Sequence, residues 1–589
     1  MTEPELIIGA PLSTSEEEEV AQVYEQRADH LELNTFAQNT VLTNDTEEWI
    51  RALTGTGAKL LVGPRGCGKT HLMRFAFSEC QDNVEHPLAI YTNLNRYYRL
   101  EPLLRKRPDA IPMFYTWVLS NIFVALHEAL GAFATQQGVI IDRDSLLELN
   151  VGDVQDLIGT LEQSRRPLNN TEDELASRLT VDRIKAFFLR SADALSRRRV
   201  VLLLDDAALT LTPEYLSHFF DIFRALKAAR IAPKASVYPG TTEYGPSFHA
   251  AHEADSIFVW KAVTDGNYLN FMADIGRKRC PDAADLPEET RTLLAYAAFG
   301  VPRSFMSLVQ NYVKGRKSSS PATAQSLLNR VIEDFCSEKM REYLSLREKK
   351  PQLATIISVG AMCFNKIVSD LAEANQALAD GTTRQIYVGI AAEGVDRKPY
   401  VERMLRLLEE VGMIYKFPSV SHGDREYVRY VPHLAALQNQ RAFTRKGAFS
   451  PKLSVEILQR PDEKHAVRRS ISTLLEAETI DGLGLDLPNC LNCHTKRVEG
   501  AKYCFQCGAK LTDESSYDRV MQSLLADVPG LTDWQREKLS QASSVPQTIG
   551  EFLALQDRGT TLRTIPRIGK IRAATVIGAV EAYLEEYLS

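Results

Sequence analysis

This sequence of 589 residues lacks long apolar runs and a basic leader segment. It also shows no tetratricopeptide or leucine-rich repeat array. No apolar run approaches the length of about 18 residues that a membrane-spanning helix needs, so we expect no membrane partner. The start, MTEPELIIGA, has no basic segment followed by an apolar stretch, and no secretory signal is expected. Apolar residues at 44% and charged residues at 25% exclude collagen-like and wholly disordered chains. The sequence thus predicts a globular cytoplasmic protein of about three to five domains.

A strong excess of one charge is confined to the start of the chain. Residues 1–45 carry a net charge of −9, so the rest carries +2 within a total of −7. We interpret residues 1–34 as an acidic, flexible, solvated segment. Whole-chain charge therefore does not decide whether nucleic acid is a partner. Five of the nine cysteines are scattered and four cluster near the C-terminus, which favours a reducing compartment and a metal site over a disulfide framework.

The strongest local signal is a glycine-rich loop between an apolar strand and a helix. Residues 59–62 read Lys-Leu-Leu-Val, and residues 63–70 match G-x-x-x-x-G-K-T, a context that argues against a mere surface turn. Backbone N–H groups of such a loop surround phosphate oxygens at the positive end of a helix. We expect Lys69 to reach the β- and γ-phosphates and Thr70 to bind Mg²⁺. The predicted nucleotide-binding residues are Gly63, Pro64, Arg65, Gly66, Cys67, Gly68, Lys69, Thr70 and His71.

An apolar run that ends in two carboxylates follows about 135 residues later. Residues 200–204 are all apolar, as in a central parallel strand, and Asp205 and Asp206 close the run. We expect Asp205 to hold Mg²⁺ through water and Asp206 to polarise the attacking water. ATPases of this type usually carry Glu at the second position. Because Asp206 is one methylene shorter, hydrolysis is expected to be slow, which suits a switch better than a motor.

A third strand, over residues 235–238, ends in Pro239-Gly240-Thr241-Thr242. A polar residue at the tip of the strand beside the acidic one can touch the γ-phosphate and sense its loss. Thr241 and Thr242 are therefore candidate sensors. The same residues fit an ordinary turn that contains Pro-Gly equally well.

In this order, the phosphate loop, the Asp-Asp strand, the polar strand tip and the segment Gly300-Val301-Pro302-Arg303 resemble AAA+ ATPases. The resemblance is to the origin-recognition (initiator) clade and related STAND signalling ATPases, and it covers roughly residues 35–440. It implies an α/β nucleotide-binding domain over residues 35–270 and a helical lid over residues 271–345. It also implies that Arg303, at the start of a lid helix, reaches the γ-phosphate.

One feature departs from that family. AAA+ proteins usually carry an arginine finger between the two sensor positions, and this chain has no Arg from Ile231 to Gly276. Lys261 is the only cation near the expected place. Hydrolysis completed by a neighbouring subunit is therefore in doubt, and STAND-like switching is favoured.

Residues 346–440 predict a winged-helix domain. Apolar residues between Tyr400 and Val411 follow helical spacing, Gly412 ends that helix, and two β-runs over residues 413–420 and 425–431 flank a turn. An intramolecular brace, as in STAND proteins, is the alternative to DNA binding. Residues 441–487 show no clear pattern and are interpreted as a linker with some helix. The residues predicted to meet DNA phosphates here are Arg403, Arg406, Arg425 and Arg429.

Two C-x-x-C pairs lie ten residues apart within residues 488–512. Each pair places two sulfur atoms on one tight turn, so the four predict a closed tetrahedral Zn²⁺ site with a structural role. The segment resembles the common bacterial zinc ribbon. The predicted metal ligands are Cys490, Cys493, Cys504 and Cys507.

Residues 515–589 resemble a tandem helix-hairpin-helix, with a repeat at an offset of 37 that aligns 528–531 with 565–568. Such a motif grips DNA phosphates through backbone N–H groups without reading sequence. The first copy has Thr532 at the glycine position and is expected to be structural. A protein-interaction domain is the alternative for the tandem. The predicted DNA-binding residues are Arg563, Arg567, Gly569, Lys570 and Arg572.

Together these features predict a chain of α/β and helical domains that acts as a DNA-binding ATPase. Its expected cofactors are ATP, Mg²⁺ and Zn²⁺, and its nucleotide state would control its largely sequence-independent grip on DNA and the recruitment of a protein partner or of further copies of itself. It would be a bacterial or archaeal protein of the nucleoid. Two alternatives stay open: a STAND-like sensor in bacterial defence, and an ATP-dependent adaptor or loader for a helicase, nuclease or transposase.

Overall fold

The computed structural model describes most of the chain, and the predicted acidic segment at residues 1–34 lies outside the described residues. It describes residues 36–588 except 164–166, 207–212, 246, 318–322, 380–381, 444–449, 463–466, 502, 512–515 and 556.

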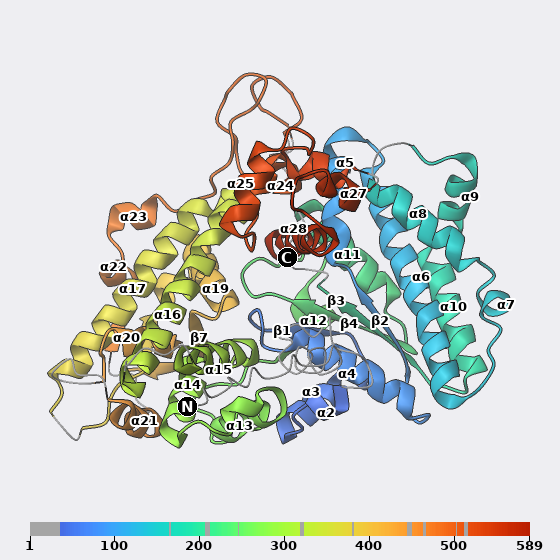
Figure 1. Ribbon diagram of the computed structural model, residues 1–589. Helices are drawn as coiled ribbons and strands as arrows, with labels where there is room; N and C mark the ends of the chain where they lie inside the picture. Colours follow the sequence, from blue (N-terminus) through green and yellow to red (C-terminus); the bar gives the residue numbers. More distant parts are fainter. Residues whose placement is uncertain are drawn as a thin grey trace, which may run out of the picture.

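A parallel sheet of five strands forms the centre of the first domain (Figure 1). Its strand order is β2-β3-β4-β1-β5, and its paired strands run parallel. β3 and β4 are buried along their whole length, as expected for strands covered on both faces. The carboxyl ends of β1, β3 and β4 therefore meet at one edge. The strands are β1 (Lys59–Val62), β2 (Leu88–Asn93), β3 (Val200–Asp205), β4 (Ile231–Val237) and β5 (Asp255–Phe258).

Helices cover this sheet, and a group of six lies in the chain between β2 and β3. The longest of them, α6, packs against β2, α8 and α11. This helical layer was not predicted from the sequence. The helices of the domain are α2 (Phe36–Asn39), α3 (Asn44–Thr54), α4 (Lys69–Asp82), α5 (Glu101–Lys106), α6 (Ala110–Gln137), α7 (Arg143–Leu147), α8 (Val151–Gln163), α9 (Asn170–Arg178), α10 (Val181–Ala194), α11 (Pro213–Leu226) and α12 (Ala250–Glu253).

Two helical segments are long and apolar enough to cross a membrane by length and composition, namely Ala110–Gln137 and Pro351–Ala377. The expectation of no such helix rested on uninterrupted apolar runs and overlooked them. About half of the most apolar stretch of each is buried inside the protein, 56% and 50%. Because α6 packs against the sheet and two helices, burial in the core accounts for its apolar composition.

The lid and winged-helix domains follow the parallel sheet and share one apolar core. The order helix, strand, two helices and hairpin, with β6 antiparallel to β8, is a winged-helix arrangement. The predicted third helix and hairpin are confirmed as α19, β7 and β8, and Gly412 ends α19 with a φ of 77°. The lid comprises α13 (Tyr268–Arg279), α14 (Glu288–Ala297), α15 (Pro302–Lys317) and α16 (Ala324–Lys349). The winged helix comprises α17 (Ala354–Ala377), β6 (Val388–Ala391), α18 (Ala392–Asp396), α19 (Pro399–Glu410), β7 (Ile414–His422), β8 (Arg425–Pro432) and α20 (Leu434–Asn439).

Residues 441–487 were predicted to be a linker with some helix, and the part that the structure describes contains short helices and also a strand that packs on the winged-helix domain. β9 (Val467–Arg469) pairs parallel with β6 and completes a sheet in the order β7-β8-β6-β9. α21 (Pro451–Gln459) packs against α14, and α22 (Ile471–Leu474) against α17 and α18. α23 (Ala477–Asp481) follows. These elements are too short to display a helical or strand period, so the pattern was missed.

In the part of the C-terminal tail that the structure describes, five α-helices lie between the two halves of the molecule (Figure 1). α25 and α28 begin 37 residues apart, at Asp533 and Lys570, as the repeat predicted. The tail packs on the first domain, where α24 contacts α5 and the N–H of Tyr517 donates to Glu101 Oε2 at 3.4 Å. The helices are α24 (Ser516–Gln522), α25 (Asp533–Gln541), α26 (Ile549–Leu553), α27 (Arg558–Arg563) and α28 (Lys570–Leu588).

Candidate functional site

The glycine-rich loop runs from the end of β1 into the start of α4, as predicted. Gly66 and Gly68 have φ values of 81° and 102°, a region that favours glycine. A Cβ atom at Gly66 would also lie 3.0 Å from the Cβ of Arg303. The loop thus needs glycine both for its backbone conformation and for the close approach of the lid.

Lys69, the first residue of α4, is buried beneath the loop. Its Nζ donates to the carbonyl oxygens of Gly63 at 2.6 Å and Pro64 at 3.1 Å. Its Nζ also lies 3.8 Å from the centre of the Tyr238 ring, a cation–π contact. Burial lowers the pKa of Lys69 from its ordinary value. Gly63 and Pro64 therefore position the lysine, while residues 65–71 line the cavity beside it.

The two carboxylates at the end of β3 have different environments. Asp205 is fully buried, and the Tyr91 hydroxyl donates to its Oδ2 at 3.0 Å. Asp206 lines the cavity. Its backbone has a φ of 50°, a conformation that aspartate tolerates better than most residues. Its N–H donates to Ser236 Oγ on β4 at 2.8 Å, and Asn93 Nδ2 donates to its Oδ2 at 3.4 Å. The side chain that faces the nucleotide cavity is thus that of Asp206, and Asp205 lies behind it.

The tip of β4 presents a different residue from the two threonines that the sequence suggested. Tyr238 lines the cavity, and its hydroxyl donates to Asp206 Oδ1 at 3.3 Å. Burial raises the pKa of Tyr238 well above its ordinary value, so the hydroxyl keeps its proton. Thr242 Oγ1 instead accepts from the Tyr238 N–H, and Thr241 contacts Glu410 of the winged helix. Neither threonine is among the cavity-lining residues, so a γ-phosphate contact by either remains only a prediction.

A cavity of about 420 Å³ lies between the first domain and the lid. Lys69, Thr70 and Asp206 line its polar end, and Arg303 of α15 joins them from the lid. The Arg303 N–H also donates to Gly66 O at 3.4 Å, which joins lid and loop. The predicted loop, acidic strand end and lid arginine therefore meet in one place.

The rest of the cavity has a partly apolar lining that suits a flat base. Val41, Ile275 and Met306 line it from the N-terminal segment and the lid. His71 is nearby, and its Nε2 lies 2.8 Å from Thr40 Oγ1. Burial, together with nearby arginines, lowers the pKa of His71 to about 3, so its ring is neutral at pH 7. Arg279 also lines the cavity close to His71, so apolar side chains, a neutral ring and one cation surround this part of it. An apolar lining with a few polar groups is typical of ligand-binding cavities.

Charged groups of the same chain flank the polar end. The Nε of Arg65 is buried without a hydrogen-bond partner in the described structure. Glu342 of α16 also lines the cavity; burial raises the pKa of its carboxyl, but Lys339 and Arg65 outweigh this and lower it. Lys261, the only cation near the arginine-finger position, ion-pairs internally. That lysine is therefore engaged within its own chain.

The winged helix is docked on the nucleotide-binding domain through the C-terminal end of α19. The Glu410 carboxylate accepts from the N–H groups of Gly240 at 2.9 Å and Thr241 at 2.7 Å, and from Thr241 Oγ1 at 2.9 Å. The Glu410 carbonyl oxygen accepts from the N–H of Arg65 in the phosphate loop at 3.3 Å. A Cβ atom at Gly240 would lie 2.8 Å from the backbone of Leu407. One residue of α19 thus contacts both the phosphate loop and the strand tip.

Sequence reasoning missed Glu410, although a signal was present. Glu409 and Glu410 end α19, where the negative end of the helix dipole disfavours acidic side chains. Burial raises the pKa of Glu409 to about 7, while Glu410 is buried with three donors to its carboxylate. An acidic residue at an unfavourable helix end indicates a tertiary partner.

The basic residues predicted to meet DNA on α19 have acidic partners in this structure. Arg403 ion-pairs with Glu243 beyond the tip of β4. Arg406 ion-pairs with Glu402 of its own helix at 2.5 Å. Arg403 is thus turned toward the first domain, whereas the Arg406 side chain stays 52% exposed beside Glu402. A DNA contact by either residue remains a prediction.

The wing residues differ from each other. Arg425 lies exposed at the hairpin turn. Arg429 donates from Nε to Pro418 O at 3.2 Å, and its guanidinium lies 5.5 Å from the Tyr387 ring centre and 5.9 Å from that of Phe417. Arg429 therefore packs on aromatic rings of its own domain, and only Arg425 is exposed.

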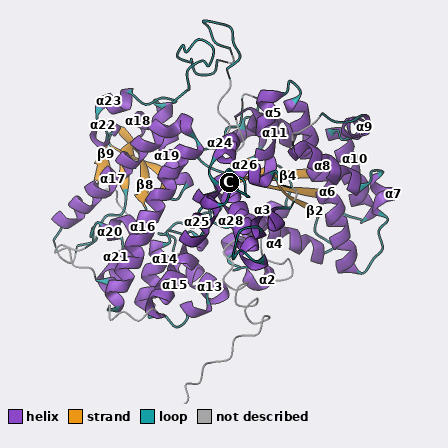
Figure 2. Cartoon of the chain, turned by 45° about the horizontal axis from the view of Figure 1, so that its top comes forward, coloured by secondary structure: helices purple, strands orange, loops and turns teal. Residues whose placement is uncertain are grey.

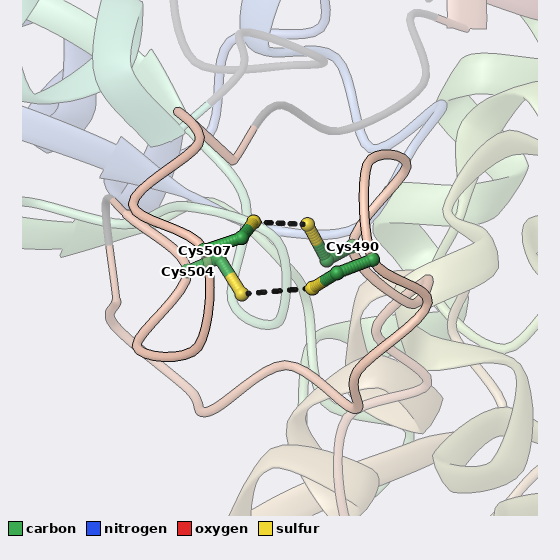
Figure 3. Close-up of side chains that lie close together, drawn as sticks. Cys490, Cys504 and Cys507 are labelled. Carbon is green, nitrogen blue, oxygen red and sulfur yellow. Dashed lines mark hydrogen bonds between the residues drawn. The ribbon is translucent and has the colours of Figure 1, made fainter.

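The four predicted metal ligands come together, and we call residues 488–512 the cysteine module. All four Sγ atoms lie within 4.8 Å of one another, with 3.5 Å between Cys490 and Cys507 and between Cys493 and Cys504 (Figure 3). A tetrahedral thiolate site with Zn–S bonds of about 2.3 Å places sulfur atoms about 3.8 Å apart. The donor set and its spacing therefore fit Zn²⁺.

The second hairpin comprises α27, α28 and the turn between them. Arg563, Arg567, Gly569, Lys570 and Arg572 are all exposed. Arg567 has a φ of 71°, matching Gly530 with 84° in the first copy. The Arg572 guanidinium lies 4.7 Å from the Trp534 ring centre, which joins the two copies. In the first copy, Thr532 and Gln535 form a capping box where the second copy has Gly569.

The fold and this site have the arrangement of an AAA+ P-loop fold with a helical lid and a winged helix. This assignment of the fold rests on the strand order, the phosphate loop after β1, the acidic end of β3 and Arg303 on the lid.

No family model matches the sequence, and no curated protein sequence matches it. Two solved structures are similar to the chain. The Walker-type ATPase of Pyrococcus abyssi is 14% identical, with 71% of this chain and 99% of that chain covered and a TM-score of 0.36. The Aeropyrum pernix ORC1 protein, solved in complex with DNA, is 14% identical, with 68% of this chain and 92% of that chain covered and a TM-score of 0.28.

Proposed function

We propose that this chain is a slow ATPase whose nucleotide state controls its grip on DNA and its recruitment of partners. The observation that carries the proposal is the position of Glu410, which links the winged helix to the phosphate loop and to the tip of β4. The presence or loss of the γ-phosphate would therefore alter the docking of α19 through this one residue. Such a protein would work at the nucleoid in the cytoplasm.

The residues of the cavity have distinct roles in this proposal. Lys69 leaves the loop carbonyls and binds the β- and γ-phosphates, while Arg303 approaches the γ-phosphate from the lid. Asp206 orients the attacking water, and Tyr238 positions that carboxylate through its hydroxyl. The hydroxyl and carboxylate oxygens of Thr70 and Asp206 suit Mg²⁺, which neutralises phosphate charge when bound.

DNA binding in the docked conformation is assigned to the second hairpin. Four exposed cations lie in and around its turn, together with the backbone N–H groups of Gly569 and Lys570 at the start of α28. Phosphate contacts of this kind are indifferent to sequence. α19 would add its arginines only after Glu410 releases the first domain.

The docked helix also favours a second candidate, a STAND-like sensor that uses the winged helix as an internal brace. The two are separated by duplex affinity, measured by fluorescence anisotropy with ATP, ADP or no nucleotide, for the wild type and Lys69→Ala. We expect ATP and ADP to give different wild-type affinities and Lys69→Ala to abolish the difference. If no DNA binds in any state, the tail is a protein-interaction domain and the sensor or adaptor function takes first place.

A further inference from the structure

The cysteine module exposes aromatic rings beside its metal-ligand pairs. Phe505 directly follows Cys504 and is 69% exposed, while Tyr503 directly precedes it and is 62% exposed. Leu491, which directly follows Cys490 in the other pair, is 84% exposed. Large exposed apolar side chains gathered on a small module indicate a binding surface, because exposed apolar residues on a protein surface are otherwise usually scattered singly.

The charge of the same module is cationic. Residues 488–512 contain four Lys or Arg and one acidic residue, Glu499. The hydroxyl of Tyr400, at the start of α19, donates to Glu499, so the one carboxylate of the module anchors it to the winged helix. Lys496 is exposed, and Lys510 is exposed directly across an antiparallel bridge from Tyr503. One cation, Lys510, therefore lies beside the rings, and Lys496 adds an exposed positive charge on the same module.

We propose that Tyr503 and Phe505 form a stacking site for the bases of single-stranded nucleic acid, with Lys496 and Lys510 on the phosphates. Rings that stack on bases, together with cations that follow the backbone, are the features that bind single strands without reading sequence. A duplex hides its base faces and would gain only the phosphate contacts. The proposal rests on the proposed nucleic-acid function, but it uses a surface separate from the second hairpin.

The position of the module gives this site a place in the function. It precedes the tail in the chain and is tied through Glu499 to the winged helix. Figures 1 and 2 show it projecting from the body of the molecule, beyond the helices of the tail. A duplex held by the second hairpin and an adjoining single strand held by the module would suit a junction between the two.

The test is the affinity for labelled oligo(dT) and oligo(U), each of about 15 nucleotides, compared with a duplex, by fluorescence anisotropy. The key variant is Tyr503→Leu with Phe505→Leu, which keeps apolar area and removes the rings. We expect single-strand affinity to fall roughly 5- to 150-fold per ring, with duplex affinity unchanged. Phe505→Trp keeps a stacking face and should retain affinity. Zinc content of each variant, equal to that of the wild type, shows that the module is intact.

Two further arms separate this site from its alternatives. Lys496→Gln with Lys510→Gln should reduce the slope of log affinity against log salt for the single strand by about 1.4. An equal loss of affinity for oligo(dT) and oligo(U) in the double leucine variant would indicate stacking alone. A difference between the two would indicate that the site also contacts the sugar. Unchanged oligonucleotide affinity in the double leucine variant, with zinc retained, would overturn the proposal and assign the surface to a protein partner. If the double leucine variant lost duplex binding alone, this result would instead contradict the function proposed for the second hairpin.

Discussion

α19 and the second hairpin show how the same sequence signal can have different structural outcomes. Both carry basic residues on a short helical motif of a kind that contacts DNA. Arg403 and Arg406 of α19 are ion-paired, and that helix is packed on the nucleotide-binding domain. Arg567 and Lys570 of the second hairpin are exposed.

The difference lies in the residues around the cations rather than in the cations themselves. α19 ends in a buried carboxylate that three donors of another domain hold. The second hairpin has Gly569 before α28, so nothing at that position competes with a phosphate for the helix N-terminus. A basic helix thus becomes a DNA contact or an internal brace according to what its end binds.

The largest effect should come from reversing charge at the second hairpin. Arg567→Glu with Lys570→Glu replaces two attractions by two repulsions at the phosphate-facing turn. We expect duplex affinity to fall by about 100-fold or more on every sequence alike, measured by anisotropy. The matched control is Arg536→Glu with Lys538→Glu on α25 of the first copy, which should have a far smaller effect. Loss confined to one DNA sequence would point to base readout instead.

The second-largest effect should come from weakening the Glu410 contacts that hold α19 on the first domain. Glu410→Gln weakens three hydrogen bonds to a buried carboxylate, each of the charge-assisted kind worth about 1.5–3 kcal/mol. We expect undocking of α19 and a duplex affinity that no longer depends on nucleotide. Burial raises the pKa of the neighbouring Glu409 to about 7, so its carboxyl is already partly protonated at neutral pH and Glu409→Gln is the matched control. A nucleotide response that survives in Glu410→Gln would exclude Glu410 as the link.

The cysteine module lies in the chain between the two regions compared here. Purified protein should carry about one Zn per chain, because thiolates at this spacing hold the metal and fold together with it. Chelation should disorder residues 488–512, abolish oligonucleotide binding there, and leave nucleotide binding at Lys69 intact. Metal analysis that finds no zinc in protein prepared without chelator would contradict this assignment.

The smallest effect concerns pH and stability on the winged-helix side. Burial, with a contribution from Lys339, lowers the pKa of His433 to about 3, against about 6.5 in the unfolded chain. The unfolded state then binds more protons between these values. The free energy of unfolding should fall as pH decreases through this window, by about 1.4 kcal/mol per pH unit for this group.

His433→Phe would remove the imidazole that takes up a proton on unfolding, and it would keep the contacts with the Phe299 and Phe335 rings. Denaturant unfolding at pH 7 and pH 5 should show a smaller pH-dependent loss than in the wild type, by about 2 kcal/mol. His422→Gln at the exposed wing turn is the control. An unchanged difference between the two pH values would show that His433 does not remain neutral in the folded state.

The sequence predicted the local parts of this molecule well and the contacts between domains poorly. The phosphate loop, Asp206, Arg303 and the cysteine ligands each depend on nearby residues or on a strand order that the motifs imply. Glu410 has no local signature beyond its unfavourable helix end, because its partners lie 169 and 170 residues away in the sequence. The contact of Thr241 with Glu410 and the position of Tyr238 at the cavity likewise depend on residues far away in the sequence. The short elements of residues 450–481 acquire their structure from the sheet and helices on which they pack.

The central claim is that nucleotide controls whether α19 is docked, and amide hydrogen exchange measures this directly. The N–H groups of Gly240 and Thr241 donate to Glu410 and are protected only while α19 is docked. Exchange of the peptide that covers residues 238–243 would be compared in ADP and in a non-hydrolysable ATP analogue, for the wild type and Lys69→Ala. The account predicts that protection differs between the two nucleotides in the wild type and that the difference disappears in Lys69→Ala. Equal protection in every nucleotide state of the wild type would contradict it.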